Sequence, residues 1–202
     1  RGNRWYDHGS GEGGLAIDFV QYYYGLSFLE AVQTLLGNGH GEVYKTVKNE
    51  EVEEVKPFIL PPRNSDMKRV FAYLIKARLI DRNIVSFFAK EKLLYESCEL
   101  SMDKRKEYHN AVFVGMDEDD NPCHGHKQGL YTKGKSFKGN VESSNPCYSF
   151  NYIGEGNKLF IFEAPIDMLS FITMNQEDWK NQSYLSLCGL SEQAVLKMLE
   201  KY

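Results

Sequence analysis

The sequence predicts an α+β chain, with helices in its first half and then a mixed sheet that runs into a parallel α/β unit. Three observations support this fold class. Apolar residues recur at the helical spacing of about 3.6 residues in segments up to residue 92. From residue 93, short aromatic and β-branched segments between turn residues predict strands. The order strand, helix, strand, helix over residues 159–202 predicts a βαβ unit with parallel strands.

Two short helices are predicted near the N-terminus, within residues 13–36. The first ends at Gly25, a residue that readily takes the left-handed conformation after a helix. The second begins at Ser27, and Glu30 stands three residues later, which predicts a capping box. Residues 41–64 are then a predicted linker, because they combine a run of acids with a pair of prolines that disfavours helix.

Two more helices joined by a tight turn are predicted over residues 65–92. Apolar residues at 67, 70, 71, 74 and 75 follow the helical period, and Asp81 or Asn83 can cap the second helix. A helix-turn-helix that reads DNA and an ordinary helical pair both fit this spacing.

Hydropathy and cysteine content indicate the cellular compartment of the protein. No apolar run reaches the roughly 18–20 residues that cross a bilayer, and no signal peptide opens the chain. We therefore expect an intracellular, cytoplasmic protein with no membrane partner. The four cysteines are widely spaced and form no Cys-x-x-Cys pair, so neither a disulfide framework nor a structural zinc site is expected.

Charge is unevenly distributed along the chain. The formal net charge is −4, so the whole chain lacks the basic excess of many nucleic-acid-binding proteins. Residues 121–141, however, carry Lys127, Lys133, Lys135 and Lys138 and no acid. Such a segment is either a solvated loop or a surface that contacts phosphates.

The segment KLFIFEAPIDMLSF carries the strongest chemical signal. An apolar strand, 159–162, delivers Glu163 at its C-terminal end, and Asp167 follows in the first turn of the next helix. Ligands of open parallel sheets gather at the carboxyl ends of strands, where a carboxylate can bind a hard cation or transfer protons. Alternatively, both acids only stabilise the helix N-terminus through its dipole.

This segment resembles the first acidic motif of the Toprim domain of bacterial primases and topoisomerases, in which a strand ends in Glu and continues with xxxD. The segments HNAVFVGMDEDDNPCHGHKQGL and SYLSLCGLSEQAVLKML are similar to primase regions before and after that motif. The helical pair is similar to a domain that accompanies Toprim in uncharacterised proteins of plasmids and mobile elements, some fused to relaxases.

The N-terminal segment WYDHGSGEGGLAIDFVQYYYGLSFLEAVQTLL resembles the end of the primase zinc ribbon. Two cysteines of that pattern align with Asp7 and Ser10, and serine is not a competent zinc ligand. We therefore predict a degenerate zinc finger without zinc, and a structural role for His8.

The resemblance implies a DNA primase-like nucleotidyltransferase in the full-length protein, with Mg²⁺ as its cofactor. Glu163 and Asp167 would be its catalytic residues, Glu163 binding the metal at the tip of a central strand. With Glu163 mid-strand, inside packing or on an outer edge, this polymerase-related interpretation would fail and only a mixed domain of unassigned function would remain. DNA, single-stranded or duplex, would be the partner in DNA replication, with nucleotides and with relaxase or replication proteins as further candidates. Lys127, Lys133, Lys135 and Lys138 would contact phosphates, and Tyr131 and Phe137 could stack on bases or pack against the protein.

A second motif, Asp-x-Asp, should follow near residue 202, and it does not occur there. The string DEDD at 117–120 lies upstream and is predicted to be a solvated turn. Because the chain also begins with Arg1, we take it as part of a longer protein with a truncated Toprim domain. A single carboxylate holds Mg²⁺ weakly, so we expect the chain itself to be inactive. Mg²⁺-dependent product from it in a primer-synthesis assay with labelled nucleotides would contradict this.

The predicted divisions are a zinc-ribbon remnant at 1–40, a linker at 41–64, a helical accessory region at 65–107, and primase-core strands with the Toprim-like part at 108–202.

Two alternative functions stay open. The chain could be a non-catalytic DNA-docking or interaction accessory of a relaxase or replication complex, or part of a Toprim nuclease. His124 and His126, next to Cys123, lie on one face of a predicted strand and could share a metal ion, although most such pairs bind none.

Overall fold

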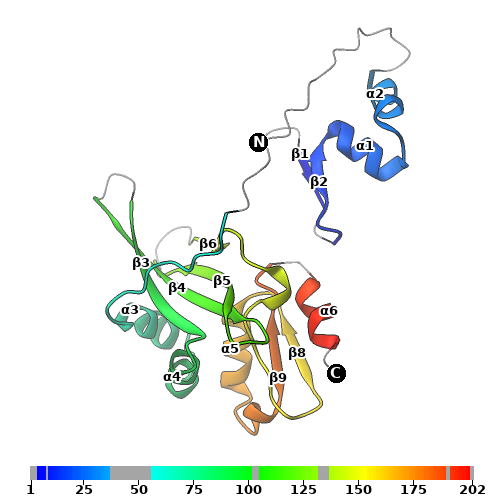
Figure 1. Cartoon of the computed structure of the whole chain (residues 1–202). Helices are drawn as coiled ribbons and strands as arrows, with labels where there is room; N and C mark the ends of the chain where they lie inside the picture. The colour runs from blue at the N-terminus through cyan, green and yellow to red at the C-terminus, as the bar shows by residue number, and fades with distance from the viewer. Residues whose placement is uncertain are drawn as a thin grey trace. The chain divides into compact units, whose positions relative to one another are not determined.

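The computed structural model describes residues 4–7, 9–36, 56–101, 105–131, 137–189 and 192–200 (Figure 1). The chain divides into two compact units, Arg1–Glu54 and Val55–Tyr202. Within the described residues, no helix is both long enough and apolar enough to span a membrane.

The N-terminal unit is a strand pair followed by two helices. Its elements are β1 (Arg4–Tyr6), β2 (Gly13–Leu15), α1 (Ala16–Tyr24) and α2 (Phe28–Leu36). The helix signals in the sequence are confirmed: Gly25 ends α1 with φ 65°, and the Ser27 amide donates to Glu30 Oε2 over 2.8 Å while Ser27 Oγ accepts from the Glu30 amide. Trp5 packs its ring against Phe19 and Tyr22.

The C-terminal unit begins with the predicted helical pair. Helix α3 (Lys68–Phe71) continues as a π-helical segment, η1 (Ala72–Ala77), and α4 (Arg82–Lys90) follows. Asp81 caps α4 by accepting from the amides of Asn83 and Ile84. The buried residues of the pair, which include Val70 and Phe88, belong to the main core, so its apolar faces pack against the sheet.

Four antiparallel strands form the first sheet of this unit, in the order β3-β4-β5-β6. Their bounds are Leu94–Leu100, Glu107–Met116, Pro122–Gly129 and Lys138–Asn140. Side chains alternate between the two faces, as the pleat requires. Leu94 and Phe113 join the main core with the helices, whereas Tyr95, Val112 and Val114 form a smaller cluster on the other face.

Part of the predicted linker lies against this sheet. Residues 56–64 belong to the C-terminal unit: Tyr95 donates to the Pro61 carbonyl over 2.8 Å, and the Arg63 guanidinium lies 4.3 Å from the Tyr95 ring centroid. Residues 41–55 lie outside the described part of the chain. The predicted division at 107/108 falls inside the β3–β4 hairpin, because β4 begins at Glu107.

The second sheet contains the predicted βαβ unit. Its strands are β7 (Asn151–Tyr152), β8 (Leu159–Phe162) and β9 (Ser183–Ser186), in the order β7-β9-β8 with β8 and β9 parallel. The helices are α5 (Pro165–Met174) and α6 (Gln193–Leu199), and short 3-10 segments occur at η2 (Pro146–Tyr148) and η3 (Trp179–Asn181).

Helices α5 and α6 cover opposite faces of this sheet (Figure 1). In β9, Tyr184 packs in the core that contains α5, whereas its neighbour Leu185 packs against Ala194 and Met198 of α6. The predicted fold class, α+β with a parallel α/β unit at the end, is thus confirmed. Helix α6 begins after Glu192.

Candidate functional site

The predicted carboxylates stand at the junction of β8 and α5. Strand β8 ends at Phe162, and Glu163 follows immediately with an exposed side chain. Pro165 occupies the first turn of α5, where its missing amide costs no hydrogen bond. Asp167 lies in the same turn, exposed, where its charge complements the helix dipole. The sequence therefore placed both acids correctly relative to the strand end.

The position of β8 in the sheet differs from the expectation of a central strand. Within the described residues β9 is central, and β8 pairs with β9 on one side only. The expectation is wrong because strand order depends on pairing partners, which the local sequence of β8 does not specify. An outer-edge strand counts against the polymerase-related interpretation of Glu163.

A small pocket, which we call the α5 notch, lies beside Asp167. It has a volume of about 70 Å³ and is lined by Arg78, Phe113, His126, Gln128, Lys138, Ala164, Pro165, Ile166 and Asp167. Lys138 and Asp167, predicted for different roles, thus line one pocket. Ligand pockets are typically about 300–1,000 Å³, so the notch can receive a few atoms, such as a phosphate edge, and not a whole nucleotide.

Two cationic side chains contribute to the notch. Lys138 begins β6 and is exposed. Arg78, which the sequence did not single out, donates from Nε and one terminal nitrogen to Tyr73 Oη over 3.0 and 2.9 Å. These two bonds orient its guanidinium. The notch therefore combines two positive groups with one carboxylate.

A family model matches the part of the chain that contains this junction. Residues 160–202 match a family model described as Toprim-like. These residues run from β8 through Glu163, Asp167 and α5 to the end of the chain. This part of the chain is similar to Toprim-like domains. Residues 72–156 match a family described as a protein of unknown function, DUF3991.

A curated relative and a solved structure are similar over nearly the whole chain. The uncharacterised protein pXO2-78 of Bacillus anthracis is 28% identical over 207 residues, covering 98% of this chain and 57% of the relative. The crystal structure of the Aquifex aeolicus primase (zinc binding and RNA polymerase domains) aligns with 99% of this chain and 58% of that chain, at 16% identity and a TM-score of 0.37. The chain thus spans less than two thirds of the proteins it matches.

Of the four lysines predicted to contact phosphates, only two lie in the described residues. Lys127 is half-buried in β5, pairs with Glu99 Oε2 at 3.2 Å and lies 5.6 Å from the Phe137 ring centroid. Its charge is therefore partly neutralised within the protein. Lys138 is the more accessible of the two, while Lys133 and Lys135 lie outside the described residues.

The turn at 117–120 is not wholly solvated. Asp117 closes it by accepting from the amides of Asp119 and Asn121. Glu118 accepts from the Tyr148 hydroxyl and pairs with Lys197 of α6 at 3.1 Å. The Tyr148 hydrogen bond, more than the lysine, lowers the pKa of Glu118 to about 2. This acid ties the turn to α6, while Asp119 and Asp120 are exposed.

At the N-terminus, the two positions aligned with zinc-binding cysteines form a closed turn. Asp7 accepts from the Gly9 amide and from Ser10 Oγ, both over 2.9 Å. The Gly9 amide, followed by the Ser10 hydroxyl, lowers the pKa of Asp7. A carboxylate engaged by its own turn and a serine hydroxyl do not fit a zinc ribbon. His8 lies outside the described residues.

The two histidines of β5 are buried in the sheet. His126 Nδ1 donates to Asn140 Oδ1 over 2.7 Å, and burial is the main cause that lowers its pKa. His124 Nδ1 is buried without a hydrogen-bond partner. Burial, reinforced by the neighbouring His126, lowers the pKa of His124 to about 4. Cys123 instead directs its sulfur to the Gly115 carbonyl.

His124 should make the fold sensitive to acid. Because its pKa is about 4 when folded and about 6.5 when unfolded, the unfolded state binds more protons between these values. Stability therefore rises with pH across this window and is lost as pH falls from about 6.5 to 4, by about 3 kcal/mol in total. Urea unfolding at pH 7.5, 5.5 and 4.5 should show this loss, and His124→Asn should reduce it. An unchanged pH profile in the variant would refute the assignment.

Proposed function

We propose that the chain is the nucleic-acid-binding module of a primase-like Toprim protein. In the longer protein, Glu163 and Asp167 would take part in Mg²⁺-dependent nucleotidyl or phosphoryl transfer. The observation that carries this proposal is the exposed Glu163 at the carboxyl end of β8, inside a βαβ unit that matches a Toprim-like family model.

Residues of this chain fit a magnesium ion only in part. Mg²⁺ prefers six oxygen ligands and is usually held by carboxylates together with water and substrate phosphates. Glu163 and Asp167 offer two carboxylates, and in the described part of the chain no group of three acids, histidines or cysteines gathers around them. When bound, Mg²⁺ would neutralise charge on transferring phosphates. We therefore assign no catalytic step to this chain alone and expect it to be inactive.

The chain's own contribution is to hold a phosphate backbone near this strand end. Lys138 and Arg78 flank the α5 notch, and α5 starts there with the positive end of its dipole. Such contacts depend on charge and position rather than on base identity. Exposed Phe137, the residue before Lys138, can offer a ring for stacking on an unpaired base.

Single-stranded DNA binding provides the test. Fluorescence anisotropy with a labelled oligonucleotide, repeated over a series of salt concentrations, should show salt-sensitive binding by the chain. Lys138→Gln should weaken binding about 3- to 10-fold and reduce the slope of log affinity against log salt by about 0.7. Lys158→Gln is the matched control. Lys158 is an exposed lysine directly before the first residue of β8, at the end of the strand opposite Glu163.

Equal losses in both variants would indicate non-specific attraction and contradict the placement at the notch. Absence of any DNA binding would contradict the proposed function itself. Binding by the chain combined with a longer protein that lacks transfer activity would instead favour the accessory of a relaxase or replication complex.

A further inference from the structure

One face of the β3–β4 hairpin gathers side chains of the kinds that bind transition metals. Cys98 lies directly opposite His109 in the antiparallel register, and Glu107 lies two residues before His109 on the same strand. Since side chains two residues apart share a face, Glu96, two residues before Cys98, joins them. The face thus carries two carboxylates, a thiol and an imidazole, away from the Glu163 site.

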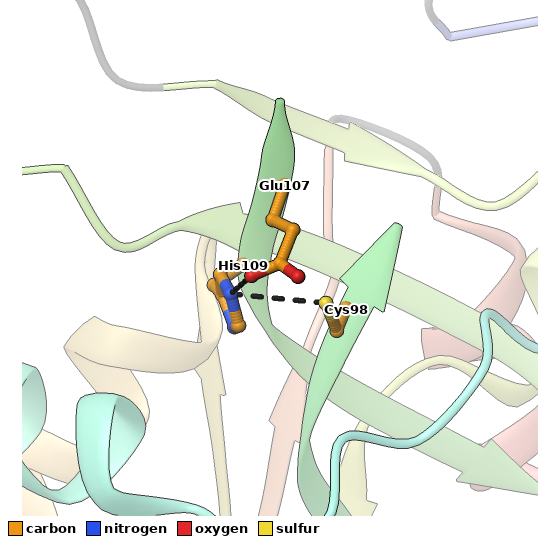
Figure 2. Close-up of side chains that lie close together, drawn as sticks. All are labelled: Cys98, Glu107 and His109. Atoms are coloured by element: carbon orange, nitrogen blue, oxygen red, sulfur yellow. Dashed lines mark hydrogen bonds and ion pairs between the residues drawn. The ribbon is translucent and has the colours of Figure 1, made fainter. Parts of the chain in front are cut away.

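Three of these groups point at one another (Figure 2). Cys98 Sγ lies 3.7 Å from His109 Nε2, and Glu107 Oε2 lies 3.3 Å from the same nitrogen. All three ligand atoms lie within 4.8 Å of one another. Zinc bonds of about 2.0–2.3 Å in a tetrahedron place ligand atoms about 3.3–3.6 Å apart, so the two shorter separations already approach that geometry.

The imidazole is held in the orientation that a metal ligand needs. His109 Nδ1 lies 2.8 Å from Glu96 Oε1, and the Glu96 side chain is fully buried. Glu96 is itself fixed, because it accepts from Asn64 Nδ2 and from the backbone amides of Arg69 and Val70. An Nδ1–H that donates to a carboxylate leaves the Nε2 lone pair for a metal ion, as is usual for histidines that bind zinc.

The cluster also borders a pocket. A pocket of about 530 Å³ is lined by Glu107 and His109 together with residues of α3, of η1 and just after β5, among them Arg69, Tyr73 and Leu130. Because His109 and Glu107 form part of its wall, an ion bound between them would face this pocket. Zinc sites with three protein ligands keep the fourth position for water or another ligand.

We propose that Cys98, Glu107 and His109 bind one Zn²⁺ ion, with Glu96 as the positioning residue and the fourth coordination position open to this pocket. The thiol of Cys98 loses its proton to solvent as the Zn–S bond forms. The proposal departs from the sequence-based expectation of no zinc, which was drawn from Asp7, Ser10 and the spacing of the cysteines. It does not depend on the proposed nucleic-acid function.

A titration of the metal-free chain with Co²⁺, followed by competition with Zn²⁺, tests this. One equivalent of Co²⁺ should produce the charge-transfer absorption of a cobalt–thiolate bond together with tetrahedral d–d bands, and Zn²⁺ should abolish both. Cys98→Ser should remove the thiolate band, and Glu107→Gln should weaken binding at least about 100-fold. Both positions are partly or fully exposed, so folding should persist.

Cys147→Ser is the matched control, because Cys147 is another half-buried free cysteine, near Gln193 and outside this cluster. It should leave the spectrum and the stoichiometry unchanged. No thiolate band in the wild-type chain, or a band that survives Cys98→Ser, would overturn the proposal. In that case His109 would serve only as a hydrogen-bond partner between two carboxylates.

Discussion

Replacing Gly115 with alanine is expected to lower the free energy of unfolding by about 3 kcal/mol or more. A Cβ at this position would overlap the carbonyl oxygen of Tyr148 and lie 2.8 Å from its carbonyl carbon. Both are backbone atoms, so no side-chain rotation relieves the clash. Strand β4 cannot move away easily, because it pairs with β3 on one side and β5 on the other. Urea unfolding monitored by circular dichroism measures the loss.

Gly139→Ala provides the control for this prediction. The nearest atoms to a Cβ at 139 belong to the Phe137 ring at 3.4 Å, an ordinary contact with an exposed side chain that can adjust. This variant should therefore change the free energy of unfolding by less than about 1 kcal/mol. Similar midpoints for the two variants would show that the approach of residue 148 to β4 is looser than the structure indicates.

Local signals in the sequence were enough to predict most helices and strands. Gly25, the Ser27–Glu30 capping box and Asp81 act within a few residues of their own position, so their effects can be read without knowing the fold. The βαβ unit was predicted for the same reason, because its strand, turn and helix are contiguous. The placement of Glu163 directly after β8 follows from this local order.

Features that depend on distant partners could not be predicted in the same way. The edge position of β8 is set by which strands pair. Lys127 resembled a free cation in the sequence, but in the sheet it meets Glu99, 28 residues away. The α5 notch combines Arg78 of the helical pair with Lys138 of β6 and Asp167 of α5, three segments that only the folded chain brings together.

The Cys98 cluster could be predicted only in part from the sequence. The spacing Glu-x-Cys at 96–98 and Glu-x-His at 107–109 could have been read as two alternating strands, each with its polar groups on one face. The antiparallel register that places Cys98 opposite His109 was the missing step. Cys-x-x-Cys spacing does not indicate such a site, because its ligands belong to two strands.

Glu96→Ala is expected to lower the free energy of unfolding by about 3–5 kcal/mol, measured in buffer with a chelator so that metal binding makes no contribution. The buried carboxylate accepts from four donors: His109, Asn64 and the backbone amides of Arg69 and Val70 at the start of α3. Removing it leaves His109 Nδ1 and the amides of Arg69 and Val70 without this acceptor and removes the hydrogen bonds that join α3 to β3.

Glu99→Ala is its matched control on the same strand, where a less buried glutamate pairs with Lys127 at the sheet surface. Partly exposed ion pairs contribute little, so this variant should cost about 1 kcal/mol or less. If Glu96→Ala were equally mild, water would be replacing the carboxylate, and Glu96 could not be the rigid support that holds His109 Nε2 toward Cys98 and Glu107. The stability of the helix–sheet contact and the orientation of the metal-binding imidazole therefore depend on the same side chain.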